Sequence, residues 1–309
     1  MRFVALLGLV VLGSTVWAQT PAKLAATVNG EPVPLADLDR VVEMIVKEKF
    51  KMQPPTDAQR RQVRMEMLTL LINDLLMKQF LRKQAPPADP VEVDKQFGEF
   101  VNNLKTQKPP RTFQEFTQET GQTEPMVRGN IAATLQWIAY VKAAVKDADV
   151  ERYYAESKDF FDQVAVRASH IVIRTTPETS DGERVQARNK LTALRAELAG
   201  GKLEFAEAAK QHSQCPSAPT GGDIGYFSRK GMLDENFARV AYALKVGEIS
   251  DVVETEFGYH IIKVTDRKAG QPSDYQKIKE EVRDFYIEEL RQKLLMQQHK
   301  AGKIDIMVP

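Results

Sequence analysis

Residues that can carry chemistry near neutral pH are few in this sequence and lie mostly in one stretch. Histidines occur at positions 170, 212, 260 and 299, and Cys215 is the one cysteine. Three of the histidines and the cysteine fall between residues 164 and 268. Imidazole changes charge close to neutrality and a thiolate is a nucleophile, so this stretch is where acid–base or nucleophilic chemistry is expected.

His170 and His260 lie in segments whose apolar neighbours predict strands. A lone histidine in such a segment is usually a core residue with a satisfied hydrogen bond. Alternate side chains of a strand share a face, so His170 falls with Val172, and His260 falls with Ile262 and Val264. Two histidines in one small sheet are costly to bury unless they bind each other or a ligand. We therefore expect the two to act together, and we expect the other two histidines to be exposed and structural.

The elements around the two histidines predict a small α+β domain over residues 164–268. Its expected order is βααβαββ, which implies a four-stranded antiparallel sheet. The strands are expected near residues 163–174, 225–228, 252–254 and 259–265, and the helices near 183–198, 205–211 and 235–244. The first of these helices is expected to bury the side chains of Val185, Leu191, Leu194 and Leu198.

Residues 24–160 predict a second, mostly helical domain. Asn29-Gly30 favours a tight turn between two very short strands. Capping boxes at 56–59 and 112–115, and Asp89-Pro90, predict the starts of three helices. This region contains no histidine and no cysteine, which favours a binding or scaffold role over catalysis.

A final helix is predicted over residues 273–300, begun by the capping pattern Ser273 to Gln276. Its apolar stripe follows the β-rich domain in the chain and needs a partner. We predict that this helix returns to pack on the N-terminal helices and completes their domain.

Residues 1–18 have the layout of a secretory signal peptide. Arg2 precedes an apolar run, and Val16 and Ala18 form a small-residue cleavage pattern. The run is shorter than the roughly 20 residues of a membrane-spanning helix. We expect secretion across the inner membrane, cleavage after Ala18 and a soluble periplasmic or extracytoplasmic protein. Membrane contact is expected only if the segment stays uncleaved as an anchor.

The composition of the chain limits the number of domains and the classes of partner and cofactor that we expect. A chain of 309 residues allows about two domains. The 43 Lys and Arg against 42 Asp and Glu leave a formal charge of +1, which argues against a nucleic-acid partner. A single cysteine excludes an intramolecular disulfide and a Cys-rich metal site. We expect no metal and no nucleotide or redox cofactor.

Four motifs in order over residues 164–268 resemble the parvulin (PpiC-type) family of peptidyl-prolyl cis-trans isomerases, or rotamases. They are ASHIVI at 168–173, HSQCPS at 212–217, GGDIGYF at 221–227 and TEFGYHIIKV at 255–264. The flanking regions resemble the SurA and PrsA type of extracytoplasmic foldase, with a helical chaperone domain that opens on VNGEPV and a C-terminal helix that rejoins it. The resemblance implies a multidomain α and α+β protein.

The resemblance also implies roles for particular residues. His170 and His260 match the paired central histidines, Cys215 matches the position that faces the prolyl bond, and Thr255 matches the hydroxyl that supports the pair. The apolar proline pocket corresponds to Ile224, Met232 and Phe237, with one more residue between the last two than in the family pattern. Phe257 stands where phosphate-directed members have a small polar residue.

The resemblance implies an isomerase and chaperone that acts on unfolded or partly folded secreted polypeptides. Rotation about an Xaa-Pro bond has a barrier near 20 kcal/mol and breaks no covalent bond, so an apolar slot and polar groups near the carbonyl suffice. Between residues 164 and 268, 15 basic and 14 acidic residues balance, which argues against phosphate-directed recognition.

Two alternatives remain open from the sequence. One is a holdase-type chaperone whose parvulin domain is weak or inactive, since the long helical half carries no catalytic residue types. The other is an enzyme that uses Cys215 as a nucleophile with His170 or His260 as its base. The sequence contains no recognisable nucleophile elbow for that chemistry.

Overall fold

The structure, a computed structural model, describes residues 23–51, 53–176 and 178–308. Its contacts divide the chain into two compact units. Unit 1 comprises Met1–Lys146 and Ile287–Pro309, and unit 2 comprises Asp147–Tyr286. The predicted signal peptide, residues 1–18, lies outside the described residues. Within those residues, every helix is too short or too polar to span a bilayer.

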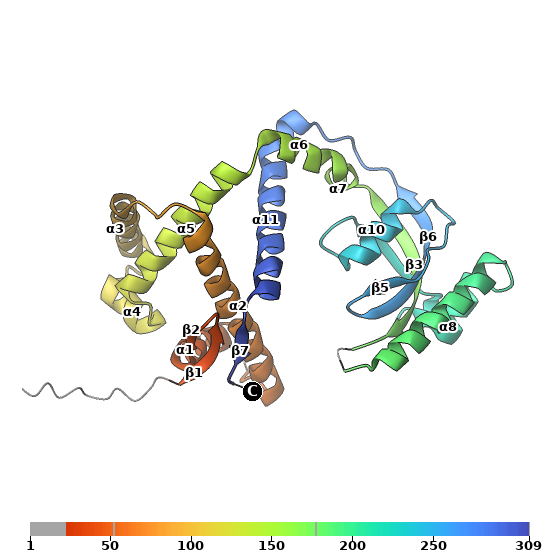
Figure 1. Ribbon diagram of the computed structural model, residues 1–309, viewed down its shortest axis with the longest axis horizontal. Helices are drawn as coiled ribbons and strands as arrows, with labels where there is room; N and C mark the ends of the chain where they lie inside the picture. The colour runs from red at the N-terminus through yellow and green to blue at the C-terminus, as the bar shows by residue number, and fades with distance from the viewer. Residues whose placement is uncertain (1–22, 52, 177, 309) are drawn as a thin grey trace, which may run out of the picture. The chain divides into compact units, whose positions relative to one another are not determined.

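Unit 1 is mainly helical, with a small sheet at the chain termini (Figure 1). Thr56 and Thr112 each accept a hydrogen bond from the backbone three residues later, and the residue there bonds back, so both predicted capping boxes are present. Its elements are β1 (Leu24–Val28), β2 (Glu31–Pro34), α1 (Leu35–Lys49), α2 (Asp57–Gln84), α3 (Pro90–Thr106), α4 (Phe113–Thr120), α5 (Glu124–Ala144), β7 (Ile304–Ile306) and, from Ile287 on, α11 (Tyr275–Ala301).

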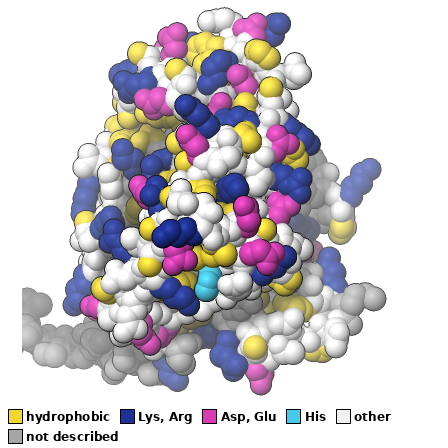
Figure 2. Space-filling model, turned by 90° about the vertical axis from the view of Figure 1, so that its right-hand side faces the viewer, with side chains coloured by type: hydrophobic (Ala, Val, Ile, Leu, Met, Phe, Trp, Pro, Cys, Tyr) yellow, Lys and Arg dark blue, Asp and Glu magenta, His cyan; other side chains and the backbone are white. Residues whose placement is uncertain are grey.

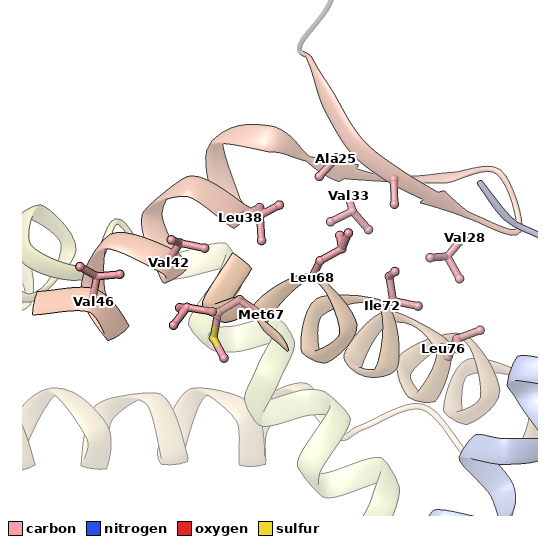
Figure 3. Packing of buried hydrophobic residues seen from close by; sticks show 12 residues of the cluster. Ala25, Val28, Val33, Leu38, Val42, Val46, Met67, Leu68, Ile72 and Leu76 are labelled. Carbon is pink, nitrogen blue, oxygen red and sulfur yellow. The ribbon is translucent and has the colours of Figure 1, made fainter. Parts of the chain in front are cut away.

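The core of unit 1 lies between β1, β2, α1 and α2. Residues four apart on a helix share a face, so α1 presents Leu38, Val42 and Val46 together, and α2 presents Leu68, Ile72 and Leu76. Figure 3 shows these side chains directed into one layer below the strands, which add Ala25, Val28 and Val33. All of them are buried.

The C-terminal segment joins this unit. Leu294 of α11 packs in a cluster with Met77 and Phe80 of α2, and β7 pairs antiparallel with β1 to give the strand order β2-β1-β7. Asn29 donates its backbone N–H to the carbonyl of Lys303 at 2.7 Å and accepts the N–H of Lys303 on its side chain at 2.8 Å. The predicted return of the C-terminal helix to the N-terminal elements is confirmed. Strand β7 was not predicted, because three residues are too few to show a periodicity.

Unit 2 contains one four-stranded antiparallel sheet with the order β4-β3-β6-β5, which confirms the predicted βααβαββ fold. Its elements are α6 (Asp147–Glu156), α7 (Lys158–Phe161), β3 (Ala165–Arg174), α8 (Asp181–Ala199), α9 (Phe205–His212), a 3-10 turn (Ala218–Thr220), β4 (Asp223–Ser228), α10 (Glu235–Ala243), β5 (Val253–Thr255), β6 (Gly258–Lys268) and the first part of α11.

The alternation of side chains along β3 and β6 builds two different faces. Odd-numbered residues such as Ile171 and Ile261 pack in one cluster with the residues of α8 and α9. Even-numbered residues such as Ala168, Ile262 and Val264 pack in another cluster with α10. Both histidine positions are even, so the strand period places them on the α10 face.

Two details of the sequence prediction are wrong. Val185 is 57% exposed, because α8 packs through Ala187, Leu191, Leu194 and Leu198, and a residue two before Ala187 lies about 200° around the helix. The side chain of Ser273 does not cap α11. It donates to Asp162 at 2.6 Å, and Asp274 accepts the N–H of Gln276 instead.

The core of unit 1 can be tested with two leucines of the same helix. Leu68→Ala removes a side chain that is 1% exposed and leaves a cavity, so we expect a loss of about 2–5 kcal/mol in the free energy of unfolding. Leu70→Ala removes one that is 57% exposed and should change it by no more than about 0.5 kcal/mol. Urea unfolding of the full chain measures both, and equal losses would contradict this packing.

Candidate active site

The register of β3 and β6 brings the two histidines together. Val172 lies opposite His260 and His170 lies opposite Ile262, so the histidines are diagonal neighbours on one face of the sheet. Their Nδ1 atoms are 3.2 Å apart, within hydrogen-bond distance, and their rings lie nearly parallel at 19° with centroids 5.4 Å apart. Both side chains are buried.

Thr255 holds the second histidine from the end of β5. Its Oγ1 lies 2.8 Å from Nε2 of His260 and accepts the backbone N–H of Phe257 at 3.1 Å. The same oxygen lies 3.4 Å from the carbonyl of Gly258, which offers it a second acceptor. A chain of hydrogen bonds therefore runs from Thr255 through His260 to His170.

Two proton arrangements satisfy this chain. In one, Thr255 donates to Nε2 of His260, and Nδ1–H of His260 donates to His170. In the other, both bonds reverse and Thr255 donates to the carbonyl of Gly258. The far end of the chain, Nε2 of His170, is buried and has no hydrogen-bond partner among the described residues. It is an N–H donor in the first arrangement and an acceptor in the second.

Burial keeps both imidazoles neutral. It lowers the pKa of His170 to about 4, with a smaller contribution from the positive charge of Arg174. It lowers the pKa of His260 to about 3, with smaller contributions from His170 and Arg174. An Nδ1–Nδ1 hydrogen bond needs one protonated and one bare nitrogen, and two neutral rings in complementary tautomers satisfy it.

Phe237 of α10 packs against both rings. It is 4% exposed, and its ring meets each imidazole edge-on with centroids 5.5 Å apart. The start of α10 fixes its position, because Oδ1 of Asp234 accepts the N–H groups of Asn236 at 2.8 Å and of Phe237 at 3.2 Å.

Gly222 fixes the backbone of His170. The N–H of His170 donates to the carbonyl of Gly222 at 2.9 Å. A Cβ on Gly222 would lie 2.3 Å from the carbonyl oxygen of His170, and its φ of +79° is in the left-handed region. Only glycine fits this contact without displacing the strand.

A cavity of about 630 Å³ opens beside the pair, and all eight site residues predicted from the sequence line it. Phe237 is its buried floor, whereas Met232 and Phe257, at 62% and 57% exposed, lie at its rim. Cys215 is half-buried in the wall. The eight residues are His170, Cys215, Ile224, Met232, Phe237, Thr255, Phe257 and His260.

Sequence reasoning missed further lining residues, namely Val172, Arg174, Leu233, Asp234 and Glu256, together with Gly231. Two of them could have been predicted from the strand period, since Val172 and Arg174 follow His170 at intervals of two.

On the face of the molecule that Figure 2 shows, Lys and Arg side chains lie among Asp and Glu side chains.

Comparison with known proteins identifies the family. The model of the family "Rotamase: PPIC-type PPIASE domain" matches residues 170–266. A foldase protein PrsA from Geobacillus sp. (strain WCH70) is 32% identical over 237 residues, which cover 76% of this chain and 75% of that protein. The chain belongs to the PrsA foldase family. The PrsA of Clostridium botulinum (strain Loch Maree / Type A3) is 28% identical over 305 residues, 91% of this chain and 87% of that protein.

A solved PrsA structure is similar as well. The peptidylprolyl isomerase PrsA from Bacillus anthracis aligns at a TM-score of 0.46 and 26% identity, over 75% of this chain and 96% of that one. Family membership and the matched domain make this PrsA-family chain a peptidyl-prolyl cis-trans isomerase with a chaperone role. The resemblance found in the sequence is confirmed.

The neutral histidine pair predicts an unusual pH response. In the unfolded chain both histidines have their ordinary pKa of about 6.5, whereas folding lowers it to about 4 and about 3. The unfolded state therefore binds more protons in this window, and the stability of unit 2 should fall as the pH drops below about 6.5. In the folded protein, NMR of ¹⁵N-labelled histidine should show both rings neutral at pH 5.5. Midpoints near 6.5 for either ring would contradict the assignment.

Proposed function

We propose that the protein rotates Xaa-Pro bonds of unfolded polypeptides in the cavity beside His170 and His260. The observation that carries this proposal is the neutral, hydrogen-bonded histidine pair that meets the buried ring of Phe237 edge-on at the wall of an open cavity. An apolar floor next to polar groups of fixed orientation is what a twisted prolyl amide requires.

The mechanism we propose is non-covalent. Amide resonance sets the rotation barrier, so a site that binds the twisted amide better than the planar one accelerates rotation. Phe237 and Ile224 contact the proline ring, and Met232 and Phe257 enclose it from the rim. His170 lines the carbonyl side of the bond, while His260 and Thr255 hold His170 in place. Cys215 borders the same bond with a half-buried thiol.

The hydrogen-bond pattern disfavours Cys215 as a nucleophile. Both ring nitrogens of His260 are occupied, one by His170 and one by Thr255. The remaining nitrogen, Nε2 of His170, has no hydrogen bond to the thiol. A nucleophilic cysteine needs an oriented base, and in this arrangement neither histidine serves as one.

Substitutions in the cavity test the mechanism in a protease-coupled prolyl peptide assay on the full chain. Phe237→Ala removes the floor and should lower kcat/KM by about tenfold or more, since burial of such a ring contributes several kcal/mol. Cys215→Asp should retain isomerisation and abolish labelling by iodoacetamide. Leu70→Ala in unit 1 serves as the control and should leave kcat/KM unchanged.

A Cys215→Asp variant without activity would favour the covalent alternative. A wild-type chain that gives no acceleration over the uncatalysed rate would contradict the isomerase proposal and favour the holdase. Unit 1 supports a holding role of its own, because it contains a cavity of about 540 Å³ whose apolar lining includes Met44, Leu71, Leu75 and Met126. Methionine side chains adapt to apolar groups of varied shape.

We further propose that the protein works outside the cytoplasm on secreted polypeptides. The signal-peptide pattern of residues 1–18 supports this, and slow prolyl isomerisation of newly exported chains gives such an enzyme its task.

A further inference from the structure

The segment between β4 and α10, residues 229–234, forms part of the cavity rim, and we call it the rim loop. Gly231, Met232, Leu233 and Asp234 of this loop all line the cavity. Met232 and Leu233 are exposed, so two apolar side chains are held at the opening of the cavity. The rim loop contains no helix or strand. Its position therefore depends on individual contacts rather than on a ladder of backbone hydrogen bonds.

Local bonds fix the rim loop to its neighbours in the chain. The hydroxyl of Ser228 donates to the carbonyl of Lys230 at 2.9 Å, and the N–H of Ser228 donates to the sulfur of Met232 at 3.4 Å. The guanidinium of Arg229 binds the carboxylate of Glu235 through two N–O contacts of 2.6 and 2.9 Å. These bonds join the loop to the end of β4 and the start of α10.

Lys230 connects the rim loop to a helix far away in the sequence. Its Nζ donates to the hydroxyl of Tyr153 at 3.0 Å and lies 4.4 Å from the centroid of the same ring. Tyr153 belongs to α6 and precedes Lys230 by 77 residues. The negative face of an aromatic ring attracts an ammonium, and the hydroxyl oxygen adds a hydrogen-bond acceptor. The contact thus holds the loop two residues away from Met232.

The side chain of Tyr153 is itself firmly placed. It is 7% exposed, and its ring packs against Phe161 and Tyr286 with centroids 6.0 and 5.4 Å apart. Tyr153 is not among the described residues that line the cavity. It also lies outside residues 170–266, the stretch that the parvulin family model matches. Tyr153 is therefore placed to support the rim loop and not to touch a substrate.

We propose that Tyr153 is a positioning residue for prolyl isomerisation, because through Lys230 it holds Met232 where that side chain encloses the proline ring. This inference rests on the proposed function and extends the catalytic unit to α6. The rim contacts the proline ring, which is the same in the planar and the twisted amide. Loosening the rim loop therefore weakens binding of both states, which raises KM and leaves kcat nearly unchanged.

Kinetics of the full chain on one prolyl peptide, with KM and kcat measured separately, test this proposal. Tyr153→Phe removes the hydroxyl and keeps the ring, so we expect KM to rise by about two- to threefold. Lys230→Met removes the ammonium and with it both parts of the contact, so KM should rise by about three- to tenfold. Lys230→Arg keeps a cation that stacks on the ring and should stay close to the wild-type KM. In all three variants kcat should stay within about twofold of the wild type.

The next residue of α6 provides a matched control. The hydroxyl of Tyr154 donates to the carbonyl of Ser273 at 2.7 Å and does not contact the rim loop. Tyr154→Phe therefore removes a hydrogen-bonded hydroxyl from the same helix and should leave KM unchanged. A double variant, Tyr153→Phe with Lys230→Met, should have the KM of Lys230→Met alone, because both changes remove one contact.

A second measurement reports the position of the rim loop without catalysis. In a full chain labelled with ¹³C-methyl methionine, the NMR signal of Met232 is the one that Met232→Leu removes. That signal should move in Tyr153→Phe and in Lys230→Met, and it should keep its wild-type position in Tyr154→Phe.

Several results would overturn the proposal. Among them are a Lys230→Met chain with the wild-type KM, an unmoved Met232 signal, and a loss confined to kcat. A rise of KM in Tyr154→Phe as large as in Tyr153→Phe would show a general effect of α6 instead. If Tyr153→Phe does not fold, Lys230→Met on the surface loop decides. A wild-type chain without activity contradicts the proposed function itself, which is a different result from an active chain whose KM ignores Tyr153.

Discussion

A single buried hydrogen bond between two Nδ1 atoms constrains the whole catalytic unit. It requires one protonated and one bare Nδ1, because two protonated nitrogens would repel each other and leave no acceptor. Burial on the α10 face of the sheet favours the neutral form of both rings, and Thr255 occupies the other nitrogen of His260. The cost of burying two polar rings is thereby offset by hydrogen bonds on three of their four nitrogens. The fourth, Nε2 of His170, is buried and has no hydrogen-bond partner among the described residues.

The surrounding fold positions the two histidines and Phe237. The register of β3 and β6 brings the histidines within one diagonal step, and Gly222 holds the backbone of His170 at a contact that no other residue allows. The N-cap of α10 directs Phe237 onto both rings. At the far end of the same strands, a second glycine, Gly258, lies opposite Arg174, and a Cβ there would lie 2.2 Å from the carbonyl oxygen of Ile173. The pairing of these two strands thus positions the histidine pair.

Features of the fold that depend on neighbouring residues in the chain could be predicted from the sequence. Capping boxes at Thr56 and Thr112 marked helix starts within one residue, and the strand period placed His170 and His260 on one face. Contacts over long sequence distances were harder to predict. Strand β7 depends on pairing with β1 some 280 residues earlier, and the contact between His170 and His260 depends on the register of β3 and β6. The resemblance to the family motifs predicted the eight cavity residues. Which of them are buried at the floor and which are exposed at the rim became clear only from the structure.

The central claim is that Thr255, His260 and His170 act as one hydrogen-bonded chain. Its most direct test compares kcat/KM of the full-length Thr255→Val and Thr255→Ser variants on one prolyl peptide. Valine has the shape of threonine without the hydroxyl and leaves a buried imidazole nitrogen unpaired, so it should lose about tenfold or more. Serine keeps the hydroxyl and should stay within about threefold of the wild type. Equal activity of the two variants, with both folded by circular dichroism, would contradict the account.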